Sequence, residues 1–242
     1  MSQLNDNLVE IKRQKDTYLL PENLKKDVEL LGVTGTYEGE GKSFPPDWTE
    51  IGYENTPDVI VKIFNYAKEI QDNWDSSITN MRNKYSSDKN LYIFPLVNTS
   101  NVTTMFQAFL ASNLTDLANI DTSNVIDFSY AFRGCKFESF PQLNTSNATG
   151  NNYMFVECSN LKNLPVLNFK SINNLGFNNT YSNCTSLTDE SLNNILASLI
   201  TATSYGGTKT LAFIGLDSTQ ATTCTTLSNW QACVDAGWST GY

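Results

Sequence analysis

The chain has 242 residues, of which 40% are hydrophobic and 17% charged, so it is long enough for one large domain or two small ones with a buried core. Its net charge of −9 and its scattered Lys and Arg residues argue against nucleic-acid binding, which needs a basic patch to replace phosphate counterions. The sequence has no run of about 18 apolar residues and no N-terminal apolar segment, so we expect neither a transmembrane helix nor a signal peptide.

Residues 1–42 are predicted to form an N-terminal attachment and oligomerisation segment. Leu4, Leu8 and Ile11 follow one another at helical spacing. A helix this short needs a partner in water, which favours a homo-oligomer, with a trimer as one arrangement. A frayed terminus is the alternative. Pro21 opens a predicted helical turn, and residues 28–33 have the pattern of a strand between turn-forming glycines, which predicts a small helical and β-hairpin adaptor.

Residues 43–90 are predicted to be a helical connector that also covers the start of the next region. Apolar residues recur at helical spacing between Thr56 and Tyr85. Asp75, Ser76 and Ser77 interrupt this pattern, which predicts a turn that caps a second helix.

Residues 91–187 repeat with a period of about 23 residues. The pentapeptide at 98–102 returns at 121–125 and at 144–148, and a looser fourth copy begins at Leu167. Such a period predicts a short solenoid of about four coils, with neutral polar residues bonded in ladders at the corners. The ladder residues predicted from this pattern are Asn98, Thr99, Asp121, Thr122, Asn144 and Thr145.

A second set of residues keeps the same period and is predicted to form the core. Phe109, Phe132 and Phe155 are 23 residues apart, and Tyr181 follows after 26. A cysteine lies three residues beyond each of the last three rings. These cysteines are Cys135, Cys158 and Cys184. Free thiols are favoured in a chain without a signal peptide, although a disulfide between adjacent coils remains geometrically open.

Residues 188–242 are predicted to be a cap of different structure that covers the last coil. Thr188 is a candidate N-cap for an amphipathic helix. Residues 210–215 have the pattern of a strand, residues 225–236 that of a further helix, and residues 238–242 that of a last strand. The expected fold class is therefore α+β, with a helix-strand-helix cap after the solenoid.

The chemistry of common enzymes is absent from the sequence. The chain has no histidine, which removes the commonest general base and the commonest metal ligand. Its acidic residues do not form a recurring pair of the kind a glycosidase needs. We therefore expect no enzyme, no catalytic residue, no metal and no cofactor, with a weak glycosidase as the remaining catalytic alternative.

The repeats resemble a known class. The segments NTSNVTTMFQAF, DTSNVIDFSYAFRGC and NTSNATGNNYMFVEC are similar to the units of BspA-type leucine-rich repeats of bacterial surface proteins, which read roughly DTSNVTxMxxMFxxCxxL. The resemblance covers about residues 90–242, because the C-terminal residues look like the usual cap of such arrays. Ser112 at a cysteine position and Ala148 at a valine position depart from the pattern.

The N-terminal segment IKRQKDTYLLPENLKKDVELLGVTGTYEG resembles a segment of phage and prophage tail or baseplate proteins, with Asp27 in place of the usual glycine. This resemblance implies a virion structural protein of a tail, baseplate or fibre, made in the host cytoplasm and located in the virion. Its partners would be other virion proteins and a host-surface polysaccharide or protein. Two alternatives are a head-fibre or decoration protein without a receptor, and a bacterial surface adhesin.

Overall fold

The computed structural model describes residues 29–30, 33–34, 57–173, 176–202 and 204–242. The chain divides into two compact units, one with residues up to Trp74 together with Ile93–Leu96, and the other with Asp75–Tyr92 and Val97–Tyr242. The predicted anchor residues Leu4, Leu8 and Ile11 lie outside the described residues.

The described residues of the first unit include a short β-pair and a helix. Strands β1 (Glu29–Leu30) and β2 (Val33–Thr34) pair antiparallel, so the single strand predicted at 28–33 is wrong, whereas two antiparallel strands agree with the β-hairpin predicted for this segment. Helix α2 (Pro57–Asp72) begins at a proline, which fits the first helical position because its missing N–H would have no partner there. Its buried residues are Ile63, Ala67 and Ile70, at the spacing of one helical face.

The end of helix α2 contacts strand β3 (Ile93–Phe94) and the residues that follow this strand. All of these residues belong to the first unit. The Gln71 Nε2 group donates a hydrogen bond to the Leu96 carbonyl at 2.7 Å. The Trp74 ring meets the Phe94 ring edge-on at a centroid distance of 5.8 Å. These contacts fix the end of the helix against β3.

The second helix predicted after Asp75 is wrong. The Asp75 side chain accepts a hydrogen bond from the Ser77 N–H at 2.8 Å, which closes a turn. Beyond it the Met81 N–H donates to the carbonyl of Thr104 at 3.0 Å instead of to a residue one helical turn earlier. Apolar residues at 74, 78 and 81 match helical spacing, but the Ile78 N–H closes the turn at Asp75 and the Met81 N–H pairs with the next repeat. Residues 75–91 therefore have the geometry of the repeats that follow.

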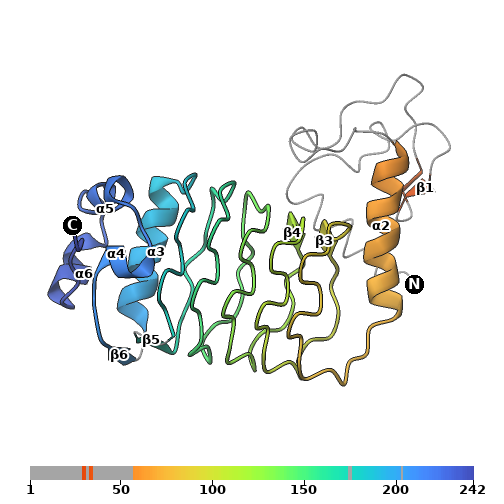
Figure 1. The fold of residues 1–242 in the computed structure, drawn as a ribbon, viewed down its shortest axis with the longest axis horizontal. Coiled ribbons are helices and arrows are strands. Elements are labelled where there is room, and N and C mark those ends of the chain that lie inside the picture. Colours follow the sequence, from red (N-terminus) through yellow and green to blue (C-terminus); the bar gives the residue numbers. More distant parts are fainter. Residues whose placement is uncertain (1–28, 31–32, 35–56, 174–175, 203) are drawn as a thin grey trace. The chain divides into compact units, whose positions relative to one another are not determined.

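Five segments of the second unit share one backbone geometry and lie side by side (Figure 1). We call residues 75–91, 98–114, 121–137, 144–161 and 168–187 repeats one to five. Isolated parallel bridges join Asn80 to Thr104, Thr104 to Asp127, and Asp127 to Gly150. Regular strand is short, with β4 (Asp116–Leu117) after repeat two, although several backbone N–H groups of each repeat donate to carbonyls of the next, as Met105, Gln107 and Phe109 do to Asp127, Ser129 and Ala131.

Each repeat turns sharply at two residues with positive φ, spaced four apart. Left-handed backbone costs a non-glycine residue about 1–2 kcal/mol. The cost is offset by hydrogen bonds from the same residues, as when Ala111 N–H donates to the Arg133 carbonyl at 2.7 Å and Gly134 N–H to the Val156 carbonyl at 2.8 Å. The positions are Asn83, Ser87, Gln107, Ala111, Tyr130, Gly134, Tyr153, Glu157, Asn179 and Asn183.

The C-terminal region begins with helix α3 (Asp189–Thr201), which the sequence predicted. The Thr188 hydroxyl accepts a hydrogen bond from the Ser191 N–H, and Asp189 and Glu190 place negative charge in the first turn, where the helix dipole favours it. Strand β6 (Ser204–Gly206) then pairs in parallel with β5 (Ser171–Asn173) of repeat five. The three remaining helices are α4 (Leu211–Ile214), α5 (Ser218–Cys224) and α6 (Trp230–Asp235).

The strand predicted at 210–215 is wrong, because these residues form α4. The Thr210 hydroxyl accepts from the Phe213 N–H at 3.0 Å, and Gly215 ends the helix with a φ of 93°. The helix predicted at 225–236 is also shorter than expected, since α6 begins at Trp230. Before it, a capping box of Asp217 and Gln220 starts α5, which the sequence reading missed.

Helix α3 pairs with the backbone of residues 162–167 through polar side chains. The Ser191 hydroxyl accepts from the Leu164 N–H at 2.8 Å, and the Ser198 hydroxyl accepts from the Leu167 N–H at 2.9 Å. The Asn194 amide donates to the Leu164 carbonyl at 3.0 Å. Their spacing of three and four residues places all three on one helical face, so α3 covers a backbone edge that would otherwise stay unpaired.

Candidate binding groove across the repeats

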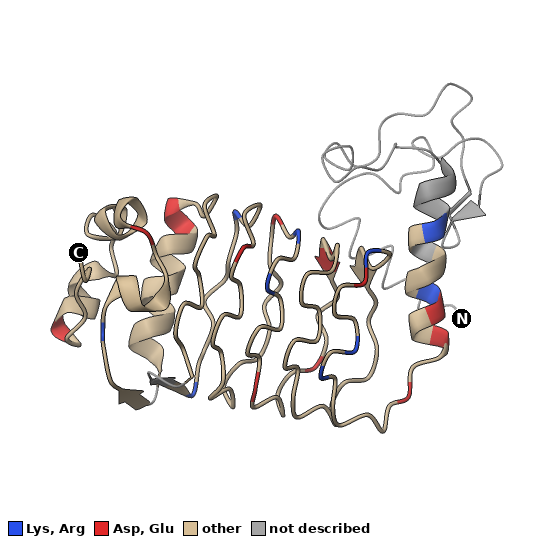
Figure 2. Ribbon diagram, in the orientation of Figure 1, with Lys and Arg blue, Asp and Glu red and all other residues tan. Residues whose placement is uncertain are grey.

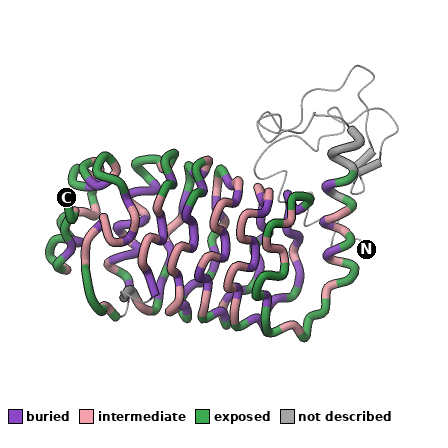
Figure 3. Tube along the Cα trace, in the orientation of Figure 1, coloured by how far each residue is buried: buried purple, intermediate pink, exposed green. Residues whose placement is uncertain are grey.

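The interior of the repeats is a column of aromatic rings. Ring centroids of Phe109 and Phe132 lie 5.6 Å apart and nearly parallel, and those of Phe132 and Phe155 lie 5.9 Å apart. Tyr85 extends the column at one end and Tyr181 at the other. Figure 3 shows buried and exposed segments alternating along each repeat. The four rings predicted from the sequence are all fully buried, so the column itself offers no surface to a ligand.

The repeat cysteines are buried beside this column as free thiols. Each thiol donates to the carbonyl of an aromatic residue in the preceding repeat, from Cys135 to Phe109 at 3.2 Å and from Cys158 to Phe132 at 3.0 Å. Cys184 is buried in the same way. Burial raises the pKa of Cys158 to about 12, so its thiol stays protonated at neutral pH and is a poor nucleophile.

The side chain of the first residue in each polar motif forms a hydrogen bond within its own repeat. Side-chain oxygens of Asn98, Asp121 and Asn144 each accept from the N–H two residues later, at 2.9–3.1 Å. These are Asx-turns, which fix the corner locally. The hydrogen bonds from Ser123 hold the pKa of Asp121 below its usual value.

The threonines of the motif connect one repeat to the next. The Thr99 hydroxyl donates to the Asp121 carbonyl at 2.6 Å, and the Thr122 hydroxyl to the Asn144 carbonyl at 2.8 Å. Thr145 is equally buried, but its hydroxyl has no partner among the described residues. The predicted ladder thus consists of side chain to carbonyl bonds, and like side chains do not bond each other.

The fourth residue of the motif was not among the predicted site residues, although it recurs as regularly. Asn101, Asn124 and Asn147 each donate from Nδ2 to a serine carbonyl of the preceding repeat, at 3.0, 2.8 and 2.6 Å. Threonine and asparagine therefore bond in opposite directions along the array. The repetition of an amide at a fixed place in the motif was the signal that could have found them.

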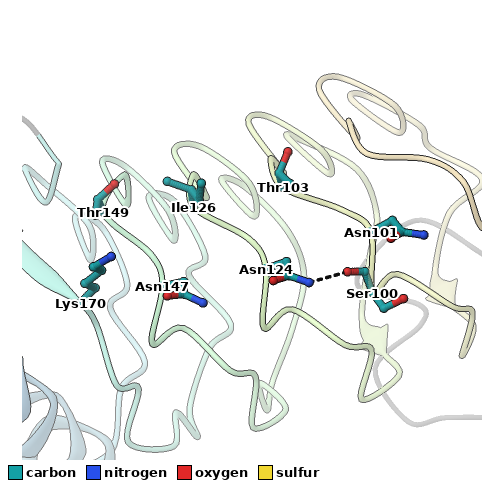
Figure 4. A pocket seen from close by; sticks show the side chains of 8 residues that line it. All are labelled: Ser100, Asn101, Thr103, Asn124, Ile126, Asn147, Thr149 and Lys170. Carbon is teal, nitrogen blue, oxygen red and sulfur yellow. Dashed lines mark hydrogen bonds between the residues drawn. The ribbon is translucent and has the colours of Figure 1, made fainter.

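These asparagines form one wall of a surface groove of about 420 Å³ that crosses the repeats. Figure 4 shows Asn101, Asn124 and Asn147 in one row and Thr103, Ile126 and Thr149 in a second row beside it. Ser100 and Lys170 complete the lining. The groove therefore offers nearly the same groups again at each repeat.

The lining is neutral apart from one cation. Its described residues include no carboxylate, and Lys170 is the only charged side chain among them. Ile126 is 51% exposed, an unusual environment for a large apolar side chain. Figure 2 shows the charged residues of the described repeats scattered rather than gathered. A ligand that fits this groove must be bound through neutral hydrogen bonds and apolar contact.

A second, half-buried row is aromatic, and its rings cover one another. The Tyr130 and Tyr153 rings stack at 4.8 Å, and Phe106 meets Tyr130 at 5.9 Å. Beside them Arg133 and Glu157 form a paired salt bridge, with hydrogen bonds of 3.2 and 3.0 Å. Because stacked rings leave mainly their edges open, this row suits stability better than it suits ligand binding.

The described residues contain no group of three or more His, Cys, Asp or Glu side chains that could hold a metal ion. Among the same residues, every helix is too short or too polar to cross a membrane.

Comparison with known proteins gives one family. Its model matches residues 58–163 and 100–205, which together extend over more than half of the 242-residue chain. No curated protein and no solved structure matches the chain. The chain belongs to the family described as Mycoplasma protein of unknown function, DUF285.

Proposed function

We propose that the chain is a bacteriophage virion structural protein that displays its repeats as a rigid, non-catalytic binding surface. In this proposal repeats one to five are a short solenoid of the BspA-type leucine-rich-repeat class. The N-terminal residues 1–42 join the protein to other virion proteins as a homo-oligomer. The proposal of a virion location rests on the sequence resemblance of the N-terminal segment.

The observation that carries the display role is the groove. Equivalent residues at 101, 124 and 147 place the same amide on the surface of successive repeats. A ligand that extends along the repeats can therefore form the same weak hydrogen bond several times. The aromatic core beneath holds these positions in register. Buried, protonated thiols add no reactive group to that surface. Such an arrangement favours recognition over chemical conversion.

The virion location is tested with the full chain. Leu4→Glu, Leu8→Glu and Ile11→Glu together should remove the chain from purified particles, because charges on the predicted helical stripe prevent its pairing. Mass spectrometry of gradient-purified virions measures incorporation, and circular dichroism checks that the repeats stay folded. If the triple variant enters particles as well as the unchanged chain, or if the unchanged chain is absent from them, the proposal is wrong.

One observation favours a second candidate, a bacterial surface protein. The family description names Mycoplasma, a cellular organism, rather than a virus. Immunolabelling of intact producing cells separates the two candidates, since a surface protein is labelled without lysis and a virion protein only after particles assemble.

A further inference from the structure

We propose that the groove over repeats two to five binds a linear, neutral polysaccharide along the direction in which the repeats stack. This inference rests on the display role proposed above, and it names the chemical class of the ligand that the displayed surface binds. It concerns the face lined by Asn101, Asn124 and Asn147 and the row beside it (Figure 4).

The unused hydrogen-bonding capacity of the asparagines points to hydroxyl groups. A carboxamide has two N–H donors and an oxygen that accepts. In Asn101, Asn124 and Asn147 one donor is used toward the preceding repeat, and no described residue donates to the amide oxygens. Each repeat step therefore offers one donor and one acceptor at the groove. A sugar hydroxyl both donates and accepts, so one hydroxyl class can match every step.

The second row supplies the contact that a sugar ring needs on its less polar face. Ile126 stands between Thr103 and Thr149 and is 51% exposed. Apolar C–H faces of pyranose rings pack on such side chains, with hydroxyls directed outward toward neighbours such as the threonines. Ile126 is one of three large apolar side chains that are exposed among the described residues, and it contributes buried apolar area once a ring covers it.

The spacing of the repeats argues against an extended peptide. Successive rings of the core column are 5.6 and 5.9 Å apart, and paired backbones lie about 4.8 Å apart. An extended peptide advances about 3.3 Å per residue and returns to the same face only after about 6.7 Å, so its side chains drift out of step. A pyranose unit in an extended glycan advances by a distance close to one repeat. Pyranose rings carry hydroxyl groups on both edges, so a unit that is turned over relative to its neighbour still presents a hydroxyl to the same row of asparagines. The periodicity therefore fits one sugar per repeat.

The charge of the lining argues against an anionic polymer. Nucleic acids and other phosphate polymers need several cations along the site, because their affinity comes from the release of counterions. The groove has Lys170 alone, at one end, and the chain carries a net charge of −9. A neutral chain with many hydroxyl groups has no such requirement.

The test uses the full chain and a panel of immobilised neutral oligosaccharides, composed of β-linked glucose, xylose or N-acetylglucosamine and of α-linked glucose. Single-stranded DNA and an extended Ser/Asn-rich peptide are the decoys. We expect binding to at least one neutral oligosaccharide and to neither decoy. We expect Ile126→Lys to weaken this binding by at least about tenfold, because a charged side chain blocks the middle of the groove.

The matched control is Val234→Lys, which introduces the same charge at another exposed apolar residue, 41% accessible and located on α6. It should leave binding unchanged, and circular dichroism should show both variants folded. Failure of the unchanged chain to bind any sugar of the panel, binding of a decoy in the groove, or equal loss in both variants would overturn the proposal. Incorporation into virions is measured separately and does not depend on Ile126, so the two proposals can fail independently.

Discussion

The backbone edge of the repeat region receives hydrogen-bond partners both from neighbouring repeats and from the C-terminal cap, but the two kinds of partner differ. Within the repeats, N–H groups donate to carbonyls of the neighbouring repeat, as Phe109 does to Ala131 at 2.9 Å. At residues 162–167 side chains of α3 take over this role, with Ser191 and Ser198 accepting from Leu164 and Leu167. The backbone bonds between repeats recur in every repeat because each partner has the same geometry. The bonds of the cap instead depend on particular side chains of α3, each of which occurs once. The repeats should therefore depend mainly on their core and the cap on individual hydrogen bonds.

The largest effect is expected in the core of the repeats. Phe132→Ala removes a ring that touches Phe109, Phe155 and Phe140, and should lower the free energy of unfolding by about 3–5 kcal/mol. Urea denaturation followed by circular dichroism measures it. Tyr130→Ala in the half-buried outer row is the control and should cost clearly less. Equal losses at the two positions would mean that the buried column does not dominate the stability of the repeats.

The cap is tested by removing a single hydroxyl. Ser198→Ala leaves the buried Leu167 N–H without its acceptor, and an unpaired buried donor costs about 1–3 kcal/mol. The same denaturation experiment measures the loss, with exposed Ser186→Ala as the control.

The comparison becomes sharper with Thr122→Ala in the repeats. It removes a donor from the Asn144 carbonyl, and a carbonyl tolerates a missing partner better than an N–H does. The loss should therefore be smaller than that of Ser198→Ala. If Thr122→Ala costs more, the distinction between a repeat that depends on its core and a cap that depends on hydrogen bonds fails.

A change of opposite sign is expected at Asn151 in repeat four. This residue is fully buried at the place that Met105 and Phe128 occupy in repeats two and three, and neither end of its amide has a partner among the described residues. Asn151→Met should raise the free energy of unfolding by about 1–3 kcal/mol, because it removes an unsatisfied polar group and fills the space with apolar atoms. Thermal denaturation detects the change, and a lower melting temperature would contradict it.

The sequence predicted the repeats better than the connections at their ends, and the reason is physical. A period of 23 residues shows which rings are neighbours, since Phe109, Phe132 and Phe155 can share a column only if each repeat has the same path. The sequence predicts helix up to Tyr85 because Met81 and its apolar neighbours also fit helical spacing. The motif of residues 75–91 begins with Asp75-Ser76-Ser77, and it lacks the asparagine that marks the later copies.

In the cap, local composition was misleading. Residues 210–215 contain Thr, Phe and Ile, which favour strands, yet the N-cap of Thr210 and the left-handed Gly215 enclose one helical turn. The groove was missed because its asparagines look like turn residues, although their repetition was a signal; the stacked repeats show that they line a surface and that each bonds a serine carbonyl of the preceding repeat. Directions of that kind depend on how repeats stack and are not encoded in the spacing alone.

The smallest predicted effect concerns the sharp turns of the repeats, where all but one of the described left-handed positions lack glycine. Ala111 has a φ of 54° and Gly134, its equivalent one repeat later, has a φ of 71°. Ala111→Gly should raise the free energy of unfolding by about 0.5–1 kcal/mol, because relief of the strained alanine exceeds the added freedom of the unfolded chain. Gly134→Ala should lower it by a similar amount, even though an added Cβ meets Ala111 only at ordinary contact distance, 3.6 Å. Paired urea titrations measure both changes. Shifts of the same sign would show that backbone conformation does not limit these turns, and stability would then depend on the inter-repeat hydrogen bonds that the two residues donate.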